Sequence, residues 1–301
     1  MVKELDITVI ILTYNEEIHI RRCLENVKQI AKDIIVVDSH STDGTIEICK
    51  EYGVNVIRHK WPGYQAAQFN WAINNVPIKT EWILRIDADE YLLPELIVEL
   101  KDKLPLLRKE VTGIEFKRRH IFMGRWVKHG IYPVKLLRMF RVGCAYYNDR
   151  VMDEHLMLTS GKSIMLENDF CDHSLIGISD YCKKHIQYAQ REAIAILEES
   201  IDNGIKDQDG SLSGQAKKKQ NTKKLYNRMP FFWRSFVYFV YRYFLKGGFL
   251  DGKEGFLFAF IQGWWYRTLV DAKVYEIKKA CGNDKVKIAE HLRDVYFIDV
   301  K

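Results

Sequence analysis

Several short apolar runs, three of them ending in turns rich in polar and acidic residues, constrain the fold of this chain most. Each run is rich in Ile, Val and Leu, which is typical of a strand buried on both faces. Segments with helical spacing of apolar residues separate the runs. Strands are expected at residues 7–12, 34–37, 54–57 and 82–86, and helices at 18–30, 45–51 and 66–75. This alternation predicts an α/β fold with a mostly parallel sheet covered on both faces.

Three polar turns, at residues 13–17, 38–45 and 87–90, follow three of the predicted strands. Ligands of open parallel sheets bind beyond the carboxyl ends of the strands. We therefore expect these three turns, which are distant in sequence, to converge on one ligand site.

The turn at residues 87–90 carries the acidic groups Asp87, Asp89 and Glu90. Carboxylates gathered at one place repel each other unless a cation joins them. Mg²⁺ and Mn²⁺ prefer such oxygen ligands and bridge well to a diphosphate. The alternative is a solvated acidic turn in which Glu90 caps the helix expected at 92–100.

The second turn begins with Asp38 at the end of its strand. A carboxylate there can accept hydrogen bonds from ribose hydroxyls or from a base N–H. We expect Asp38 to be functional, and Asp43 and Thr45 to serve the following helix as structural residues. In the first turn, Glu16 or Tyr14 is expected to face the ligand.

The later part of the chain differs in character. Residues 113–175 contain short alternating stretches typical of mixed strands and loops. Residues 179–201 read as a helix, residues 203–224 as an exposed basic loop, and two amphipathic aromatic helices are expected at about 230–246 and 254–275. We find no internal repeats.

The aromatic helices are also basic, since Lys and Arg greatly outnumber Asp and Glu in residues 206–253. Arg234, Tyr238, Tyr241 and Arg242 fall on one helical side, and Phe and Val fill the rest. This pattern suits a helix lying in a lipid interface with its charged face toward anionic headgroups, and the two arginines argue against spanning. The alternative is packing against each other or across the interface of a homo-oligomer.

Other classes of partner and compartment are disfavoured. The net charge of +6 is modest and the chain has no known nucleic-acid-binding module, so we expect no nucleic-acid partner. The six cysteines form no CxxC pair and no zinc-site spacing, which indicates free thiols in a reducing compartment. We expect neither a signal peptide nor a transmembrane helix.

The three turn segments, at 9–17, 35–45 and 87–90, resemble in order and spacing the family 2 glycosyltransferases of the GT-A fold. Further segments resemble the bacterial lipopolysaccharide-core β-1,4-glucosyltransferase subgroup. They are residues 122–126, 129–130, 132–133, 137–141 and 249–255. The resemblance extends to about residue 275.

This resemblance implies a GT-A catalytic domain over residues 1–178, with a Rossmann-like nucleotide-binding sheet. Residues 1–110 would bind the nucleotide sugar and residues 111–178 would form the acceptor side. Residues 179–301 would be a helical C-terminal extension.

The resemblance also implies a donor site and a metal site. The nucleotide would be held by Thr13, Tyr14, Glu16 and Asp38, the ribose and a divalent Mn²⁺ or Mg²⁺ by Asp87 and Asp89, and His173 would complete the metal shell. Asn70 is a further donor contact, in a stretch where Gln68 replaces the family's usual Lys. Arg138 suits a bidentate phosphate contact, and its alternative is a surface ion pair.

On the acceptor side, an inverting enzyme needs a carboxylate as general base. The segment 149–155 stands where the family has its base, so Glu154 is the candidate and Asp153 its competitor.

The implied function is inverting transfer of a hexose from a nucleotide donor, UDP-linked, to a saccharide acceptor. That acceptor would be lipid-linked, such as lipopolysaccharide core, and the enzyme cytoplasmic and peripheral on the inner face of the cell membrane. The alternatives are a polyprenyl-phosphate sugar synthase, a sugar nucleotidyltransferase and a catalytically inactive membrane-associated scaffold. The nucleotidyltransferase is disfavoured because its Gly-rich basic loop after the first strand is replaced by residues 13–17.

Overall fold

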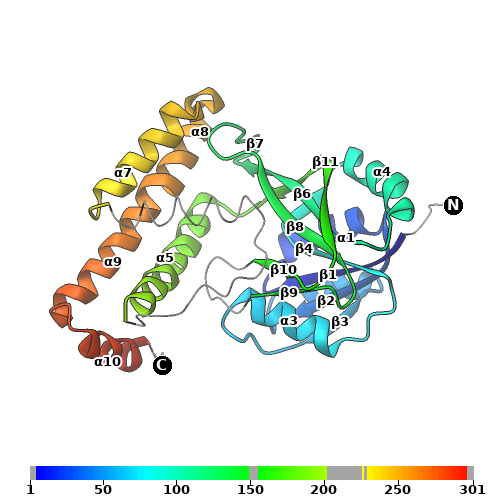
Figure 1. Ribbon diagram of the computed structural model, residues 1–301, viewed down its shortest axis with the longest axis horizontal. Helices are drawn as coiled ribbons and strands as arrows, with labels where there is room; N and C mark the ends of the chain where they lie inside the picture. The colour runs from blue at the N-terminus through cyan, green and yellow to red at the C-terminus, as the bar shows by residue number, and fades with distance from the viewer. Residues whose placement is uncertain (1–4, 149–154, 202–225, 227–228, 297–301) are drawn as a thin grey trace. The chain divides into compact units, whose positions relative to one another are not determined.

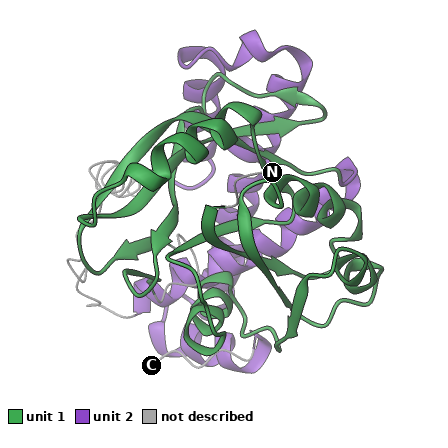
Figure 2. Cartoon of the chain, turned by 90° about the vertical axis from the view of Figure 1, so that its right-hand side faces the viewer, with its two compact units in different colours: residues 1–175 green, residues 176–301 purple. Residues whose placement is uncertain are grey.

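The computed structural model describes residues 5–148, 155–201, 226 and 229–296. The chain divides into two compact units, residues 1–175 and 176–301, which are coloured separately in Figure 2. Each unit is described by itself below.

The first unit alternates strands and helices in its first hundred residues (Figure 1). Its early elements are β1 (Leu5–Thr13), α1 (Glu17–Val27), β2 (Ala31–Asp38), α2 (Thr45–Glu51), β3 (Asn55–Arg58), α3 (Gln65–Asn75), β4 (Trp82–Asp87), β5 (Glu90–Leu92), α4 (Pro94–Lys103) and η1 (Leu104–Leu106). The later elements are β6 (Val111–Phe122), β7 (Arg125–Trp126), β8 (Val134–Arg141), β9 (Ala145–Tyr147), β10 (Leu156–Leu158) and β11 (Lys162–His173).

The main sheet has the strand order β3-β2-β1-β4-β8-β6-β11-β5, and β7 pairs with β6. The first four strands of this order run parallel. β8 is antiparallel to both β4 and β6, whereas β6 and β11 are parallel. A second, two-stranded sheet joins β9 to β10. The expected α/β fold, with parallel strands in the first part of the chain, is confirmed.

Helices cover both faces of the parallel strands. On one face, Val9 and Ile11 of β1 pack in one core with Leu24 of α1 and Leu100 of α4. On the other face, Ile10 packs with Phe69 and Ala72 of α3, and with β9. Consecutive residues of β1 thus enter opposite cores, which explains why the run is apolar throughout rather than alternating.

The four predicted strands and the helices between them agree with the structure to within a few residues. The helix expected at 92–100 begins later, at Pro94, because residues 90–92 form the short strand β5 against β11. Proline suits the first turn of a helix, where its missing N–H has no partner to lose. Glu90 therefore does not cap this helix.

The second unit is helical. Its elements are α5 (Ile178–Ile201), α7 (Trp233–Val240), η2 (Tyr241–Leu245), η3 (Gly248–Asp251), α8 (Gly252–Phe258), η4 (Ala259–Trp265), α9 (Tyr266–Cys281) and α10 (Lys285–Tyr296). A core built from α5, α9 and α10 holds it together, with Leu197, Val274 and Leu292 fully buried.

The orientation of α7 and η2 reverses the sequence-based expectation. Arg234 and Arg242, expected on a charged side that faces anionic headgroups, are buried within the second unit. Arg234 pairs with Asp271 of α9, and the Arg242 guanidinium lies over the rings of Tyr238 and Phe258. Periodicity alone placed these charges on one side of the helix, but it could not show which side faces the protein.

Within the described part of the chain, no helix has the length and apolar character needed to cross a membrane. All six cysteines are free thiols, as expected.

Candidate active site

The three polar turns lie side by side at the carboxyl ends of β2, β1 and β4. β1 is the central strand of the three: Thr13 is opposite Asp38 on β2, and Leu12 is opposite Asp87 on β4. The sheet register therefore brings the three predicted segments to one edge.

Hydrogen bonds join the first two turns into one unit. Asn15, which has a left-handed backbone (φ 56°), donates its N–H to Ser41 Oγ at 2.9 Å and accepts from the Thr42 N–H at 2.8 Å. Glu16 N donates to Thr45 Oγ1 at 2.8 Å. The turns that begin α1 and α2 thus satisfy each other's polar groups, which fixes the shape of this edge before a ligand arrives.

Asp38 is fully buried and organises the second turn. Its carboxylate accepts from Thr13 Oγ1 at 3.0 Å, from the Ser41 N–H at 2.9 Å and from Ser41 Oγ at 2.5 Å. In this conformation the oxygens of Asp38 are occupied by protein donors. The sequence analysis assigned a structural role only to the later residues of this turn, and the structure shows that Asp38 also has one.

Two other predicted donor contacts differ from each other in exposure. Tyr14 projects from the end of β1 with 59% of its surface exposed. Glu16 instead accepts from His19 Nδ1 at 2.6 Å, while His19 Nε2 accepts from the Leu175 N–H at 2.8 Å. Through His19 of α1, the Glu16 carboxylate thus helps to hold Leu175, in the segment that follows β11, against α1.

Two buried arginines form ion pairs with the carboxylate turn. Asp87 lies 3.3 Å from Arg85 and 3.5 Å from Arg138, and Arg138 approaches Glu90 to 2.6 Å. Glu90 is buried and also accepts from the Asp87 N–H at 2.9 Å. The acidic turn is therefore not a solvated one, because two of its three carboxylates are tied into an ion-pair network.

This network separates the pKa values of its carboxyl groups. Burial raises the pKa of Glu90 to about 8, and the Arg138 guanidinium opposes this rise. Burial also acts to raise the pKa of Asp87, but Arg85 and Arg138 outweigh it and hold that pKa below its ordinary value. Asp87 is thus ionised at neutral pH, in the form that can hold a cation.

Arg138 and Arg85 act on the turn from inside the protein. Arg138, predicted as a phosphate contact, is buried rather than part of a surface ion pair. Arg85, which the sequence analysis did not single out, bonds Gln65 at 2.9 Å and lies 4.6 Å from the centre of the Tyr147 ring. A lone cation in the apolar strand before Asp87 was a signal that could have identified it.

His173 lies beside the carboxylate turn, as the resemblance implied. The backbone N–H of His173 donates to the Asp89 carbonyl at 3.0 Å. Arg22 of α1 joins the two residues, since it donates to the Asp89 carbonyl at 3.0 Å, to the His173 carbonyl at 2.6 Å and to His173 Nδ1 at 3.2 Å. Because arginine can only donate, the neutral His173 ring carries its proton on Nε2. Sequence reasoning missed Arg22.

The predicted metal ligands fit a hard divalent cation through their carboxylates. Asp87 and Asp89 supply oxygen ligands of the kind that Mg²⁺ and Mn²⁺ prefer, at a strand end. In the described part of the chain, no three His, Cys, Asp or Glu side chains are already grouped to hold a metal ion. A cation here would take its remaining ligands from a diphosphate and water. His173 would have to exchange its contact with Arg22 before joining the shell.

The Arg22 contact gives a testable prediction. Burial first, and then Arg22 and His19, lower the pKa of His173. Arg22→Met removes one of these causes, so we expect the pKa of His173 to rise toward its ordinary value in an NMR titration, with His173→Gln identifying the resonance. Arg21→Met is the matched control, because Arg21 is exposed and pairs with Glu51. An unchanged His173 pKa in Arg22→Met would contradict this geometry.

Asn70 holds the hairpin that precedes the predicted base. Its side-chain amide donates to the Tyr147 carbonyl and accepts from the Tyr147 N–H, both at 2.8 Å. Two hydrogen bonds likewise join Asn148 and His155. The Asn148 N–H donates to the His155 carbonyl at 3.1 Å, and the His155 N–H donates to Asn148 Oδ1 at 2.8 Å. Asp153 and Glu154, the candidate bases, lie between these residues and outside the described part of the chain.

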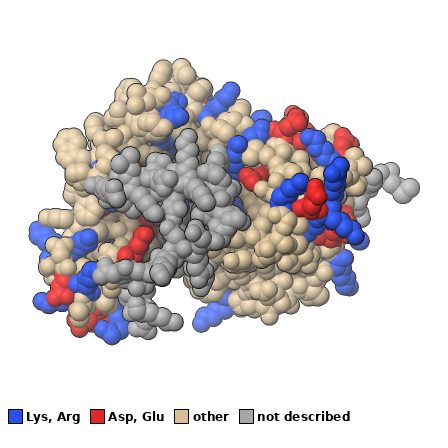
Figure 3. Space-filling model, viewed as in Figure 1, with Lys and Arg blue, Asp and Glu red and all other residues tan. Residues whose placement is uncertain are grey.

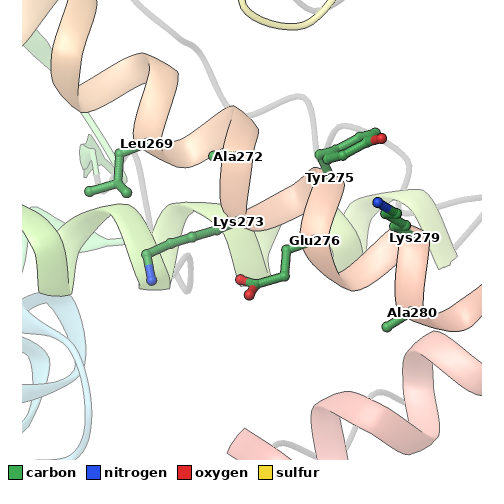
Figure 4. Close-up of a pocket in the computed structure, with 7 residues that line it drawn as sticks. All are labelled: Leu269, Ala272, Lys273, Tyr275, Glu276, Lys279 and Ala280. Carbon is green, nitrogen blue, oxygen red and sulfur yellow. The ribbon is translucent and has the colours of Figure 1, made fainter.

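A depression of about 630 Å³ lies along α9 in the second unit (Figure 4). Its described lining comes from one helix: Leu269, Ala272, Lys273, Tyr275, Glu276, Lys279 and Ala280. Lys273 there is bonded to Gln190 at 2.6 Å. The depression contains none of the predicted site residues, and we assign it no ligand.

A mostly parallel sheet whose carboxyl edge carries these interlocked acidic turns defines an α/β protein with its ligand site at that edge. The chain belongs to glycosyl transferase family 2, whose family model matches residues 8–170. It is therefore a glycosyltransferase, as the resemblance implied.

Relatives match over nearly the whole chain. An uncharacterized glycosyltransferase of Rickettsia bellii is 29% identical over 279 residues, which cover 91% of this chain and 88% of the relative. The lipopolysaccharide core biosynthesis glycosyltransferase LpsC of Rhizobium meliloti is 24% identical over 283 residues, covering 92% and 94%.

Among solved structures, the mannosyltransferase PcManGT of Pyrobaculum calidifontis, in complex with GDP-Man and Mn²⁺, is 16% identical, with a TM-score of 0.46. It covers 93% of this chain and 88% of its own. TarS 1-349 of S. aureus is 17% identical with a TM-score of 0.42, covering 95% and 91%.

Proposed function

We propose that this glycosyltransferase is an inverting, metal-dependent enzyme that moves a hexose from a nucleotide sugar, a UDP-hexose, to a lipid-linked saccharide such as lipopolysaccharide core. The observation that carries the proposal is the pair of carboxylates Asp87 and Asp89 at the end of β4, beside the turns of β1 and β2. The similarity to LpsC along the whole chain supports the choice of acceptor.

In this proposal the first two turns hold the nucleotide. Tyr14 is exposed at the end of β1 and would contact the base or ribose, with Thr13 behind it. Asp38 would shape the second turn and would reach the nucleotide only by exchanging one of its present donors.

The carboxylate turn would hold the diphosphate end of the donor. A divalent cation bound there offsets the negative charge that develops on the leaving diphosphate. Asp87 and Asp89 would ligate it, while Arg85 and Arg138 keep Asp87 ionised and in place. The fixed turn means that little reorganisation is needed when the donor binds.

Glu154, with Asp153 as the competing residue, would act as general base. The carboxylate would take the proton of an acceptor hydroxyl as that oxygen attacks the anomeric carbon, and the bond from that carbon to the diphosphate oxygen breaks. The hairpin of β9 and β10 supports this role, because Tyr147 contacts Arg85, which in turn contacts Asp87. Tyr147, which precedes the segment that holds the two carboxylates in the sequence, therefore lies near the carboxylate turn.

The lipid-linked acceptor also implies a place for the enzyme, cytoplasmic and peripheral on the inner face of the cell membrane. A polyprenyl-phosphate sugar synthase shares the donor side of this site and remains the second candidate. Transfer to a polyprenyl phosphate, in place of a saccharide acceptor, would decide for it.

A panel of nucleotide sugars tests the proposal. GT-A enzymes hydrolyse their donors slowly when no acceptor is present, so we expect Mn²⁺ to support release of a nucleoside diphosphate from one UDP-hexose, and EDTA to abolish it. Release that is equal with EDTA would contradict the metal-dependent mechanism. No release from any donor would favour the catalytically inactive scaffold.

A further inference from the structure

In α7 and η2, charged side chains face the protein and apolar side chains face outward, which is the reverse of an ordinary surface helix. Its two arginines are nearly inaccessible, with 3% of Arg234 and 7% of Arg242 exposed. Its large apolar residues point outward, with 55% of Phe244 and 75% of Leu245 exposed. A helix at a protein–water boundary normally shows the opposite pattern.

The buried Arg234 is paired inside the unit. Arg234 donates through Nε to Asp271 Oδ1 at 2.8 Å, and Asp271 also accepts from the Phe232 N–H at 2.8 Å. Ser235 and Thr268 bond each other at 2.8 Å. The polar side of α7 is therefore committed to α9, and the outward face cannot be explained as a poorly oriented helix that would turn over at no cost.

Exposed and partly exposed aromatic residues of four elements, α7, η2, α8 and η4, form a continuous surface. Successive ring centroids lie 5.0 to 6.4 Å apart. We call this surface the aromatic ridge; its rings, in order of contact, are those of Trp233, Phe236, Trp264, Phe260, Phe256, Tyr243 and Phe244. Leu245, Phe249 and Leu250 extend it, each about half or more exposed.

Charge around the ridge is mostly positive. Between residues 229 and 260, all of which the structure describes, the exposed charged residues are Lys246 and Lys253, whereas Glu254 is partly exposed and Asp251 is buried. Figure 3 shows one face of this part of the second unit, which is largely free of charged side chains. A contiguous exposed apolar surface of this kind marks a contact site.

We propose that the aromatic ridge inserts into the interface of a bilayer with anionic headgroups, with Lys246 and Lys253 at the headgroup level. This inference deepens the proposed function, and rests on it for the lipid-linked acceptor. Trp and Tyr favour the boundary between acyl chains and headgroups, and lysines near it are attracted to anionic lipid. A second copy of the chain fits less well, because the exposed charged residues near the ridge are both lysines, which would repel those of the partner, and Glu254 is only partly exposed.

The unusual orientation of Arg234 and Arg242 follows from this proposal. If the arginines of this helix faced outward, they would lie among the lipid headgroups, and the apolar face of the helix would pack against the protein. Here the unit takes both arginines inward, so the outer face of α7 presents Trp233 and Phe236 to the bilayer. The ridge thus enters the membrane from one side without crossing it.

Vesicle binding tests the proposal. The full-length wild type is expected to co-sediment with phosphatidylglycerol-containing vesicles, and less with vesicles of phosphatidylcholine alone. Phe244→Ser/Leu245→Ser is expected to weaken partitioning by roughly a hundredfold, since each truncation removes an apolar side chain worth about tenfold. Lys246→Gln/Lys253→Gln is expected to remove the preference for anionic vesicles and its sensitivity to salt.

The matched control is Val286→Ser/Val295→Ser, which removes two exposed apolar side chains from α10 in the same unit. It is expected to bind vesicles as the wild type does. Quenching of Trp fluorescence by brominated lipids, reduced in Trp233→Phe and reduced further in Trp233→Phe/Trp264→Phe, would place the ridge in the bilayer. Thermal unfolding of each variant shows whether its fold is intact.

Three outcomes would overturn the proposal. In the first, the wild type stays in the supernatant with anionic vesicles, and in the second, the ridge variants bind vesicles as tightly as the wild type. In the third, the ridge variants only convert a dimer to a monomer, which would identify a second copy as the occupant of the ridge. Hydrolysis of a soluble nucleotide sugar is a separate readout, which the ridge variants are expected to leave within twofold of wild type. Vesicle binding without any donor hydrolysis would contradict the proposed function but not the ridge.

Discussion

Asp89→Asn is expected to lower Mn²⁺-dependent donor turnover by about a hundred- to a thousandfold, the usual cost of removing one group that stabilises charge in the transition state. The substitution keeps the size of the side chain and removes one negative oxygen ligand. Asp89 is partly exposed and its carbonyl, which bonds Arg22 and His173, is retained. The fold should therefore survive, and the loss should appear in the rate of UDP release.

The control for this substitution is Asp102→Asn, which removes an exposed carboxylate from α4. It is expected to turn over donor at the wild-type rate. Turnover in Asp89→Asn within a few-fold of wild type, with the same dependence on Mn²⁺, would show that Asp89 is not a metal ligand.

Arg138→Met is expected to destabilise the first unit by about 1–3 kcal/mol, because the carboxylate of Asp87 and the carboxyl group of Glu90, whose raised pKa of about 8 leaves it largely protonated at neutral pH, both lose a buried hydrogen-bonding partner. Glu90 would lose its 2.6 Å partner and Asp87 would lose one of two guanidinium groups. The double variant Arg138→Met/Glu90→Gln is expected to be about as stable as Arg138→Met at neutral pH, because Glu90 is already largely uncharged once Arg138 is removed. Urea unfolding at neutral pH measures both variants.

Arg21→Met is again a useful control. Its ion pair with Glu51 is exposed, so its removal should change unfolding little. Equal stability of Arg138→Met and Arg21→Met would contradict the role of the buried network beneath the carboxylate turn.

The first half of the fold could be predicted from local sequence, because each of its strands is a short apolar run and each helix has its own apolar face. β1 and β4 lie between other strands of the sheet, and each contributes side chains to both cores, so their sequences are continuous apolar runs. The carboxyl ends of parallel strands meet at one edge, which is why separate turns such as 13–17 and 87–90 could be expected to share a site.

The groups that support the site could not be placed in the same way. Arg22 reaches Asp89 and His173 only after α1 packs beside β5 and β5 pairs with β11, and no local pattern encodes that contact. Arg85 and Arg138 come from neighbouring strands, and their shared contact with Asp87 depends on sheet order. Asp38 shows the same limit, because its burial depends on donors from two different turns.

The aromatic helices show a different limit of periodicity. The spacing of Arg234 and Arg242 correctly placed them on one side of a helix, but only the packing of Asp271 and the rings around Arg242 decides that this side faces inward. The sequence-based expectation of outward charges was wrong for that reason.

The most direct test of the central claim, that the three turns form a metal-dependent nucleotide-sugar site, is calorimetric titration of the full chain with UDP in the presence of Mn²⁺. The proposal predicts saturable binding that is lost with EDTA and weakened at least tenfold in Asp89→Asn. The absence of binding by UDP and by GDP with Mn²⁺ present, in protein that is folded by circular dichroism, would contradict it.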